Sequence, residues 1–307
     1  MIFEYNQGDK REGGDAMEAK LWIEAHCINA EGPVWDDLTQ TFYFIDVEAG
    51  RIFSWKDQTL QSVSVGEKIG CAVLTREGEI LAGMASGIYA MDFETGRKTL
   101  LTDPEPELLN NRFNDGKVDP RGRFYAGTMT MDAADEDPFQ GALYRLEKEG
   151  TGFTARRVIN GMGLSNGLAW SLDGKKFYLV DTRRSTVSEY EYDMETGRIG
   201  EGHVLIKVPK EMGFPDGMTI DEEGKLWVAL WGGSAVSRWD PSTGRLLEKV
   251  ELPALRVSSC CFGGEDMDQL FVTTASQDTD LSQYPLAGNV FVLQPGVRGV
   301  KSYRAAF

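Results

Sequence analysis

The feature that most constrains the fold of this chain is a unit that recurs six times along the sequence. Each copy has a polar or glycine opening, a short apolar stretch, a turn rich in Asp, Glu and Gly, and a second apolar stretch. The intervals run from 38 to 51 residues, and the copies begin at Glu31, Ile69, Asp115, Asn166, Asp216 and Ser259. This spacing is typical of one blade of a β-propeller.

Further apolar stretches follow each pair, so every copy has room for four strands. Helical periodicity is nearly absent, and a β-sandwich would not produce six copies in the same phase. The repeats therefore predict an all-β fold, a six-bladed β-propeller of four-stranded antiparallel blades around a central channel.

We expect a single domain over residues 19–307. The stretch AKLWIEAHC (Ala19 to Cys27) precedes the first copy and is expected to supply a strand to the last blade, closing the ring. The first twenty residues are polar and contain no apolar signal core, so residues 1–18 are expected to be a disordered leader, with Met17 as a candidate natural start. No apolar run approaches the ~18 residues of a membrane span, and we expect a cytoplasmic protein.

The charge of the chain limits the classes of partner. With 48 acidic and 32 basic residues the formal net charge is −16, which repels nucleic acid phosphates and anionic lipid. We therefore expect neither a nucleic acid nor a membrane as partner. Most of this acidity is expected to serve solubility, and a cation site would use only a few of the carboxylates.

Histidine and cysteine exclude several kinds of site. With only His26 and His203, a three-histidine zinc site is impossible, and both are expected on strand faces as ordinary residues. The four cysteines contain no metal-type C-x-x-C pair and are expected to be reduced core thiols: Cys27, Cys71, Cys260 and Cys261. Any chemistry must then rest mainly on oxygen ligands and carboxylates.

The polar openings of the repeats suggest such a site. The first strand of a propeller blade lines the channel, so equivalent positions of the repeats converge on one axis. Four of the six positions carry a carboxylate or carboxamide, in the column Glu31, Ile69, Asp115, Asn166, Asp216 and Ser259. Three carboxylates around one axis raise each other's pKa unless a cation compensates, and such oxygen ligands suit Ca²⁺, Mg²⁺ or Mn²⁺, with Zn²⁺ also accepting carboxylate. The alternative is that Asn-Gly and Asp-Gly are simply turn dipeptides.

Two polar residues stand directly before this column in the stretch NNRFNDGKVDP. Arg112 and Asn114 precede Asp115 and would reach the same mouth of the channel. An arginine among carboxylates is either part of a structural ion pair or a ligand for substrate oxygens.

Five motifs in order resemble one known family: EGPVW, NNRFNDGKVDPRGRFYAGTM, SNGLAWSLDGKKFYLVD, PDGMTIDEEGKLWVA and SSCCFGG. From about Leu21 to its end the chain resembles the regucalcin/gluconolactonase family, also called the senescence marker protein and luciferin-regenerating enzyme group. The resemblance implies a six-bladed propeller with one divalent metal ion in the channel and, typically, lactonase activity on sugar acid lactones.

Carried over motif by motif, the resemblance implies metal ligation by Glu31, Asn166 and Asp216. It implies substrate contacts at Arg112 and Asn114, and we add the neighbouring Asp115 to the predicted substrate-binding residues. One departure concerns a glutamate that helps to hold the sugar in the regucalcin branch. This chain has Met131 at or next to that place, and the acidic segment DAADEDP from Asp132 to Pro138 is a candidate replacement for that glutamate.

The leading hypothesis is hydrolysis of a small sugar lactone by a monomer or weak homo-oligomer. One divalent ion (Ca²⁺, Zn²⁺, Mg²⁺ or Mn²⁺) would polarise the lactone carbonyl, and Asp216 would act as general base on a water. Three alternatives stay open: a non-enzymatic calcium-binding or regulatory protein, a metal-dependent phosphotriesterase or esterase, and an interaction platform.

Overall fold

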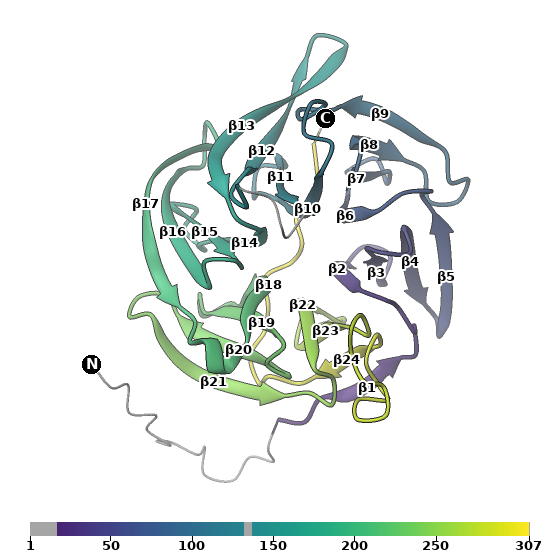
Figure 1. Cartoon of the computed structure of the whole chain (residues 1–307), viewed down its shortest axis with the longest axis vertical. Coiled ribbons are helices and arrows are strands. Elements are labelled where there is room, and N and C mark those ends of the chain that lie inside the picture. The colour runs from purple at the N-terminus through teal and green to yellow at the C-terminus, as the bar shows by residue number, and fades with distance from the viewer. Residues whose placement is uncertain (1–16, 132–136, 307) are drawn as a thin grey trace.

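The computed structural model describes residues 17–131 and 137–306 and has six four-stranded antiparallel sheets arranged as a ring (Figure 1). In each blade the strand nearest the central axis is the first of that repeat, and the next strands lie progressively further out. The predicted six-bladed β-propeller is thus confirmed.

The strands carry the labels of Figure 1. From blade 1 to blade 6 they are β2 (Ala30–Asp36), β3 (Thr41–Asp46), β4 (Arg51–Lys56), β5 (Thr59–Ser64); β6 (Ile69–Leu74), β7 (Ile80–Met84), β8 (Gly87–Met91), β9 (Lys98–Thr102); β10 (Asn111–Val118), β11 (Phe124–Thr130), β12 (Gly141–Glu149), β13 (Gly152–Met162); β14 (Ser165–Trp170), β15 (Lys176–Asp181), β16 (Thr186–Asp193), β17 (Arg198–Lys207); β18 (Phe214–Ile220), β19 (Leu226–Trp231), β20 (Ala235–Asp240), β21 (Arg245–Glu251); and β22 (Arg256–Gly263), β23 (Gln269–Ala275), β24 (Val290–Leu293), β1 (Lys20–Ile23). One 3₁₀ turn, η1 (Lys210–Met212), is the only helical element of the described residues, and no helix among them is long and apolar enough to cross a membrane.

Both ends of the chain build blade 6. Strand β1 pairs antiparallel with β24, so the predicted closing strand is confirmed, with Lys20–Ile23 as its extent. Trp22 of this strand stacks on Phe271 with ring centroids 4.1 Å apart. Met17 packs against the same apolar cluster, while residues 1–16 of the predicted leader lie outside the described residues.

The core of the molecule lies between neighbouring blades. Blades 3 and 4, for example, bury Tyr125, Trp170 and Phe177 against one another. All four cysteines are buried and free, as predicted. His203 lies on the outer strand β17, also as predicted, but the strand-face prediction for His26 is wrong. It follows β1 in a tight connection with φ of 51°, where its N–H and that of Ala25 both donate to Asn289 Oδ1.

The polar openings of the repeats are bulges inside strands. Each of the six inner strands has a register shift at or next to its column position, such as Ser165/Leu168 in β14 and Pro215/Met218 in β18. A bulge re-aims a side chain, which lets these polar residues leave the regular alternation of the strand. The turn-dipeptide alternative is therefore wrong for Asn166 and Asp216, which lie within strands.

The glycines that follow these residues allow neighbouring inner strands to come close. A Cβ on Gly217 would lie 2.0 Å from Ser259 Oγ, and one on Gly167 would lie 2.6 Å from the Cβ of Met218. Since neither glycine has a left-handed φ, close packing around the axis requires these residues, and turn geometry does not.

The segment after β24 crosses one end of the channel, a feature that the repeats did not predict (Figure 1). Gly299 bridges to Asp221 just after β18, and Ala305 bridges to Thr75 just after β6. These contacts lie at the carboxyl ends of the inner strands, whereas most column residues lie near the opposite ends. We call residues 297–306 the C-terminal strap. The strap and most of the column residues therefore lie at opposite ends of the channel.

Candidate metal and substrate site

The predicted column residues meet in the channel. Glu31 of β2, Asp115 of β10, Asn166 of β14 and Asp216 of β18 are all buried. The two remaining positions differ from them: Ile69 and Ser259 are an apolar and a small polar side chain. The functional groups of the column therefore come from blades 1, 3, 4 and 5.

The three carboxylates repel one another in this buried place. Burial, and next the charge of Asp115, raise the pKa of Glu31 to about 8. Burial followed by the charges of Glu31 and Asp115 raises the pKa of Asp216 well above its usual range, and burial raises the pKa of Asp115. Taking charged carboxylates out of water without a counter-ion is costly, so the channel favours a cation.

Asn166 adds a free oxygen to this group. Its Oδ1 is buried and has no hydrogen-bond partner in the part of the chain that the structure describes, whereas its Nδ2 donates to Thr182 Oγ1 at 3.1 Å. Buried polar atoms are normally hydrogen-bonded, so this amide oxygen beside carboxylates is available to bind an ion or a water.

The donor set fits the divalent ion that the resemblance implies. Two carboxylates and an amide oxygen, from Glu31, Asp216 and Asn166, are the ligand types that hard divalent cations prefer. Within residues 17–131 and 137–306 no cluster of three or more His, Cys, Asp or Glu side chains forms a metal site. The predicted set needs no such cluster, because its third donor is an amide.

Arg112 lies at the same end of the channel and is buried without an ion pair among the described residues. Its Nη1 donates to Phe113 O at 2.8 Å and to Asn114 Oδ1 at 2.7 Å. Burial lowers the pKa of Arg112, and the negative charge of Glu48, followed by that of Glu31, opposes this shift. These contacts favour the ligand role over a structural ion pair, because direct partners take up only one nitrogen of the guanidinium.

Asn114 and Asp115 are fixed by their neighbours. Asn114 Nδ2 donates to the carbonyl of Ser165 at 2.9 Å, which joins blade 3 to blade 4 beside Asn166. Asp115 Oδ1 accepts from Gly116 N at 2.7 Å. The predicted substrate residues therefore stand next to the predicted metal ligands, in fixed orientations.

Met131, the position of the family departure, follows the last residue of β11. Its N–H donates to the carbonyl of Asn110 at 2.7 Å and its side chain is exposed. Of the acidic segment, residues 132–136 lie outside the described residues. Replacement of the family's glutamate by this segment stays a prediction.

Sequence reasoning missed Lys117, the cation of the channel interior. Its Nζ donates to the carbonyl of Met218 at 2.6 Å, across the channel from blade 3 to blade 5. Its charge lowers the pKa of Asp115 and that of Glu31. Its position two residues after Asp115 was the available signal, since alternate residues of a strand share a face.

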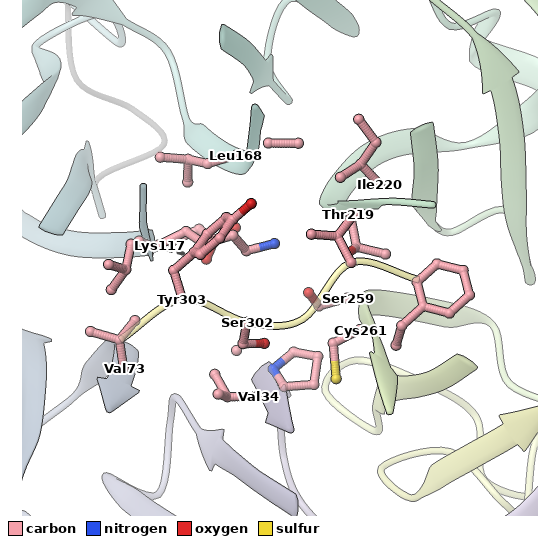
Figure 2. A pocket seen from close by; sticks show the side chains of 18 of the residues that line it. Val34, Val73, Lys117, Leu168, Thr219, Ile220, Ser259, Cys261, Ser302 and Tyr303 are labelled. Carbon is pink, nitrogen blue, oxygen red and sulfur yellow. Dashed lines mark hydrogen bonds between the residues drawn. The ribbon is translucent and has the colours of Figure 1, made fainter. Parts of the chain in front are cut away.

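A cavity of about 60 Å³ lies between Lys117 and the strap (Figure 2). Asp115 and Lys117 line it from β10, Ser259 and Cys261 from β22, and Tyr303 from the strap. Because an ordered water needs only about 10–15 Å³ of such space, the cavity has room for a few waters. It is a small compartment on the strap side of Asp115.

Comparisons with known proteins agree with this fold. The family model described as "SMP-30/Gluconolactonase/LRE-like region" matches residues 29–276. Regucalcin of Bos taurus is 37% identical over 295 residues, covering 94% of this chain and 97% of that protein.

Two solved structures share the whole architecture. A luciferin-regenerating enzyme is 29% identical with a TM-score of 0.87, covering 95% of this chain and 100% of the other. A regucalcin from Agrobacterium tumefaciens, described as a calcium-binding protein, is 25% identical with a TM-score of 0.87, covering 95% and 98%. The family match spans most of the propeller and includes every predicted site residue, and on this basis the chain belongs to the SMP-30/gluconolactonase/LRE-like family.

Proposed function

We propose that this protein is a metal-dependent lactonase that opens sugar lactones to aldonic acids. The observation that carries the proposal is the buried group of Glu31, Asp216 and the unpartnered Asn166 Oδ1. Family membership supports it, because the family description includes gluconolactonases. Its substrate would be a small neutral lactone, and the protein would act in the cytoplasm as a monomer or weak homo-oligomer.

Glu31, Asn166 and Asp216 would hold the ion. When bound, a divalent cation supplies a Lewis acid that polarises the lactone carbonyl. The raised pKa values of Glu31 and Asp216 support this role, because a neighbouring positive charge would stabilise the ionised form of each carboxylate.

Asp216 would serve as general base. Its carboxylate takes a proton from a water molecule, and the water oxygen forms a bond to the carbonyl carbon. The ring C–O bond then breaks, and the ring oxygen leaves as a hydroxyl after taking from Asp216 the proton that the water gave up. The raised pKa makes the Asp216 carboxylate a stronger base, which suits it to take a proton from water.

Arg112, Asn114 and Asp115 would position the sugar. The guanidinium of Arg112 has donors that direct partners leave open, and the carboxylate of Asp115 accepts hydrogen bonds from hydroxyls. An ion buffer would need none of these groups.

Hydrolysis of glucono-δ-lactone and of pentonolactones, followed with EDTA and after re-addition of Ca²⁺, Mg²⁺, Mn²⁺ or Zn²⁺, tests the proposal. We expect turnover to disappear with EDTA and to return with at least one ion. Full activity after complete removal of metal would refute the metal-dependent mechanism.

The second candidate is a non-enzymatic calcium-binding protein. The description of the Agrobacterium tumefaciens relative as a calcium-binding protein favours it. It predicts Ca²⁺ binding without turnover of any lactone in the same panel, so one experiment separates the two functions.

A further inference from the structure

Thr182 lies directly after β15 and joins two blades at the candidate metal site. Its Oγ1 donates to the carbonyl of Pro215 at 2.7 Å, the residue before Asp216 in blade 5. The same oxygen accepts from Asn166 Nδ2 at 3.1 Å, in blade 4. One hydroxyl therefore contacts the segments that carry two of the three predicted ligands.

Counting donors fixes the direction of these hydrogen bonds. The carbonyl of Pro215 can only accept, so the single hydroxyl proton of Thr182 must point to it. Thr182 then presents a lone pair to Asn166, and only the NH₂ end of the amide can donate to that lone pair. The orientation of the amide follows from this count of donors and acceptors.

A further observation agrees with this orientation. The Oδ1 of Asn166 is buried and meets no hydrogen-bond partner among the described residues. A reversed amide would place NH₂ at the ligand position, where it could not bind a cation.

Thr182 itself is held firmly. Its N–H donates to the carbonyl of Leu164 at 3.1 Å, and its carbonyl accepts from Ser185 N at 3.0 Å. The hydroxyl is thus presented by a turn that is fixed on both sides, which a positioning group requires.

We infer that Thr182 is a positioning residue, which orients the amide of Asn166 so that Oδ1 is its metal ligand. The inference deepens the proposed function and rests on its metal site. Residues that orient metal ligands typically change metal affinity by about 10- to 100-fold when they are replaced.

Calorimetric titration of the full-length, EDTA-treated protein with Ca²⁺ tests the inference. Thr182→Val keeps the shape of the side chain and removes the hydroxyl, so we expect Ca²⁺ binding weaker by about 10- to 100-fold. Thr182→Ser keeps the hydroxyl and should bind Ca²⁺ within a few-fold of the wild-type protein. Wild-type affinity in a folded Thr182→Val variant would overturn the inference.

The control experiment repeats Thr182→Val in a protein that also carries Asn166→Asp. A carboxylate offers an oxygen in either orientation, so it needs no group to choose its direction. Adding Thr182→Val to Asn166→Asp should therefore change Ca²⁺ affinity by no more than a few-fold. An equally large loss in both backgrounds would assign Thr182 a purely structural role and refute the orientation argument.

The thermal midpoints of all four variants in EDTA show whether the fold is kept. A wild-type protein that binds none of Ca²⁺, Mg²⁺, Mn²⁺ and Zn²⁺ would overturn the proposed metal site and this inference with it. Metal binding by the wild type without an effect of Thr182→Val would overturn the inference alone.

Discussion

At the scale of single residues, Asp216 carries the sharpest test of the mechanism. We expect Asp216→Asn to lower lactone turnover by about 10²- to 10⁴-fold, the usual contribution of a general base. The amide keeps an oxygen for the metal but cannot take a proton from water.

The control for this change is Asp173→Asn. Asp173 is also followed by a glycine, but it lies in an exposed hairpin turn where it bonds Ser171 Oγ and Lys175 N. Its replacement should leave turnover unchanged. An Asp216→Asn variant that hydrolyses lactones at the wild-type rate would contradict the base assignment.

The raised pKa of Glu31 predicts how stability depends on pH. The folded metal-free protein holds the Glu31 proton up to a pH of about 8, whereas the ordinary value for the unfolded chain is 4.5. Between these values the folded state binds more protons, so its free energy of unfolding falls as the pH rises. Ca²⁺ needs the deprotonated carboxyl, and its stabilising effect should grow over the same range.

Thermal unfolding from pH 5 to 8, with EDTA and with saturating Ca²⁺, checks this pH dependence. The side chain introduced by Glu31→Gln cannot titrate. We therefore expect the unfolding midpoint of the metal-free variant to fall less between pH 5 and 8 than that of the metal-free wild type. A midpoint for the metal-free wild type that rises over this range would show that burial does not raise the pKa of Glu31.

Motifs of the sequence predicted the candidate ligands but could not predict which residues of other blades lie around them. Glu31, Asn166 and Asp216 recur at the same phase of a repeat, so each could be found from its place in the unit. Thr182 and Lys117 act through contacts to Pro215 and Met218 in other blades. Such contacts depend on tertiary packing, which no local pattern encodes.

At the scale of strands, the glycines of the inner strands should be intolerant of any side chain. A Cβ on Gly217 would overlap Ser259 Oγ, so Gly217→Ala must push β18 and β22 apart. Overpacking of this kind costs about 1–3 kcal/mol. Chemical denaturation measures the loss as a lower free energy of unfolding.

Gly152→Ala is the matched control. This glycine begins β13, has no left-handed φ, and a Cβ there would meet only Glu149 O at 3.8 Å. We expect its replacement to be neutral or slightly stabilising. If Gly217→Ala were tolerated as well as Gly152→Ala, close approach of the inner strands would not explain the glycine.

The strands also explain why the openings looked like turns in the sequence. A polar residue followed by glycine is common in turns, and it is equally suited to a bulge where another backbone comes close. The repeat phase pointed to the channel, whereas the bulges became apparent only from the register of each inner strand with its neighbour.

At the scale of the whole molecule, the sequence predicted the number of blades but not the strap that crosses one end of the channel. Six copies of one unit define six blades, because each unit must bury its apolar faces against its neighbours. The strap carries no repeat. It is fixed by backbone bonds to Leu74 and Gly122 and by an ion pair between Arg304 and Asp36, contacts between segments far apart in the chain.

Closure of the ring yields a last prediction. Strand β1 covers the edge of β24, and Trp22 fills the space against Phe42 and Phe271. A variant that begins at residue 25 loses this strand, exposes a hydrogen-bonding edge and uncovers two buried aromatic side chains. We expect it to aggregate or to unfold well below the wild-type midpoint, because blade 6 is then a three-stranded sheet that no longer ties the two ends of the chain together.

A variant that begins at Met17 keeps β1 and should match the wild-type midpoint in thermal unfolding. Equal midpoints for the two truncations would mean that the ring holds without its closing strand.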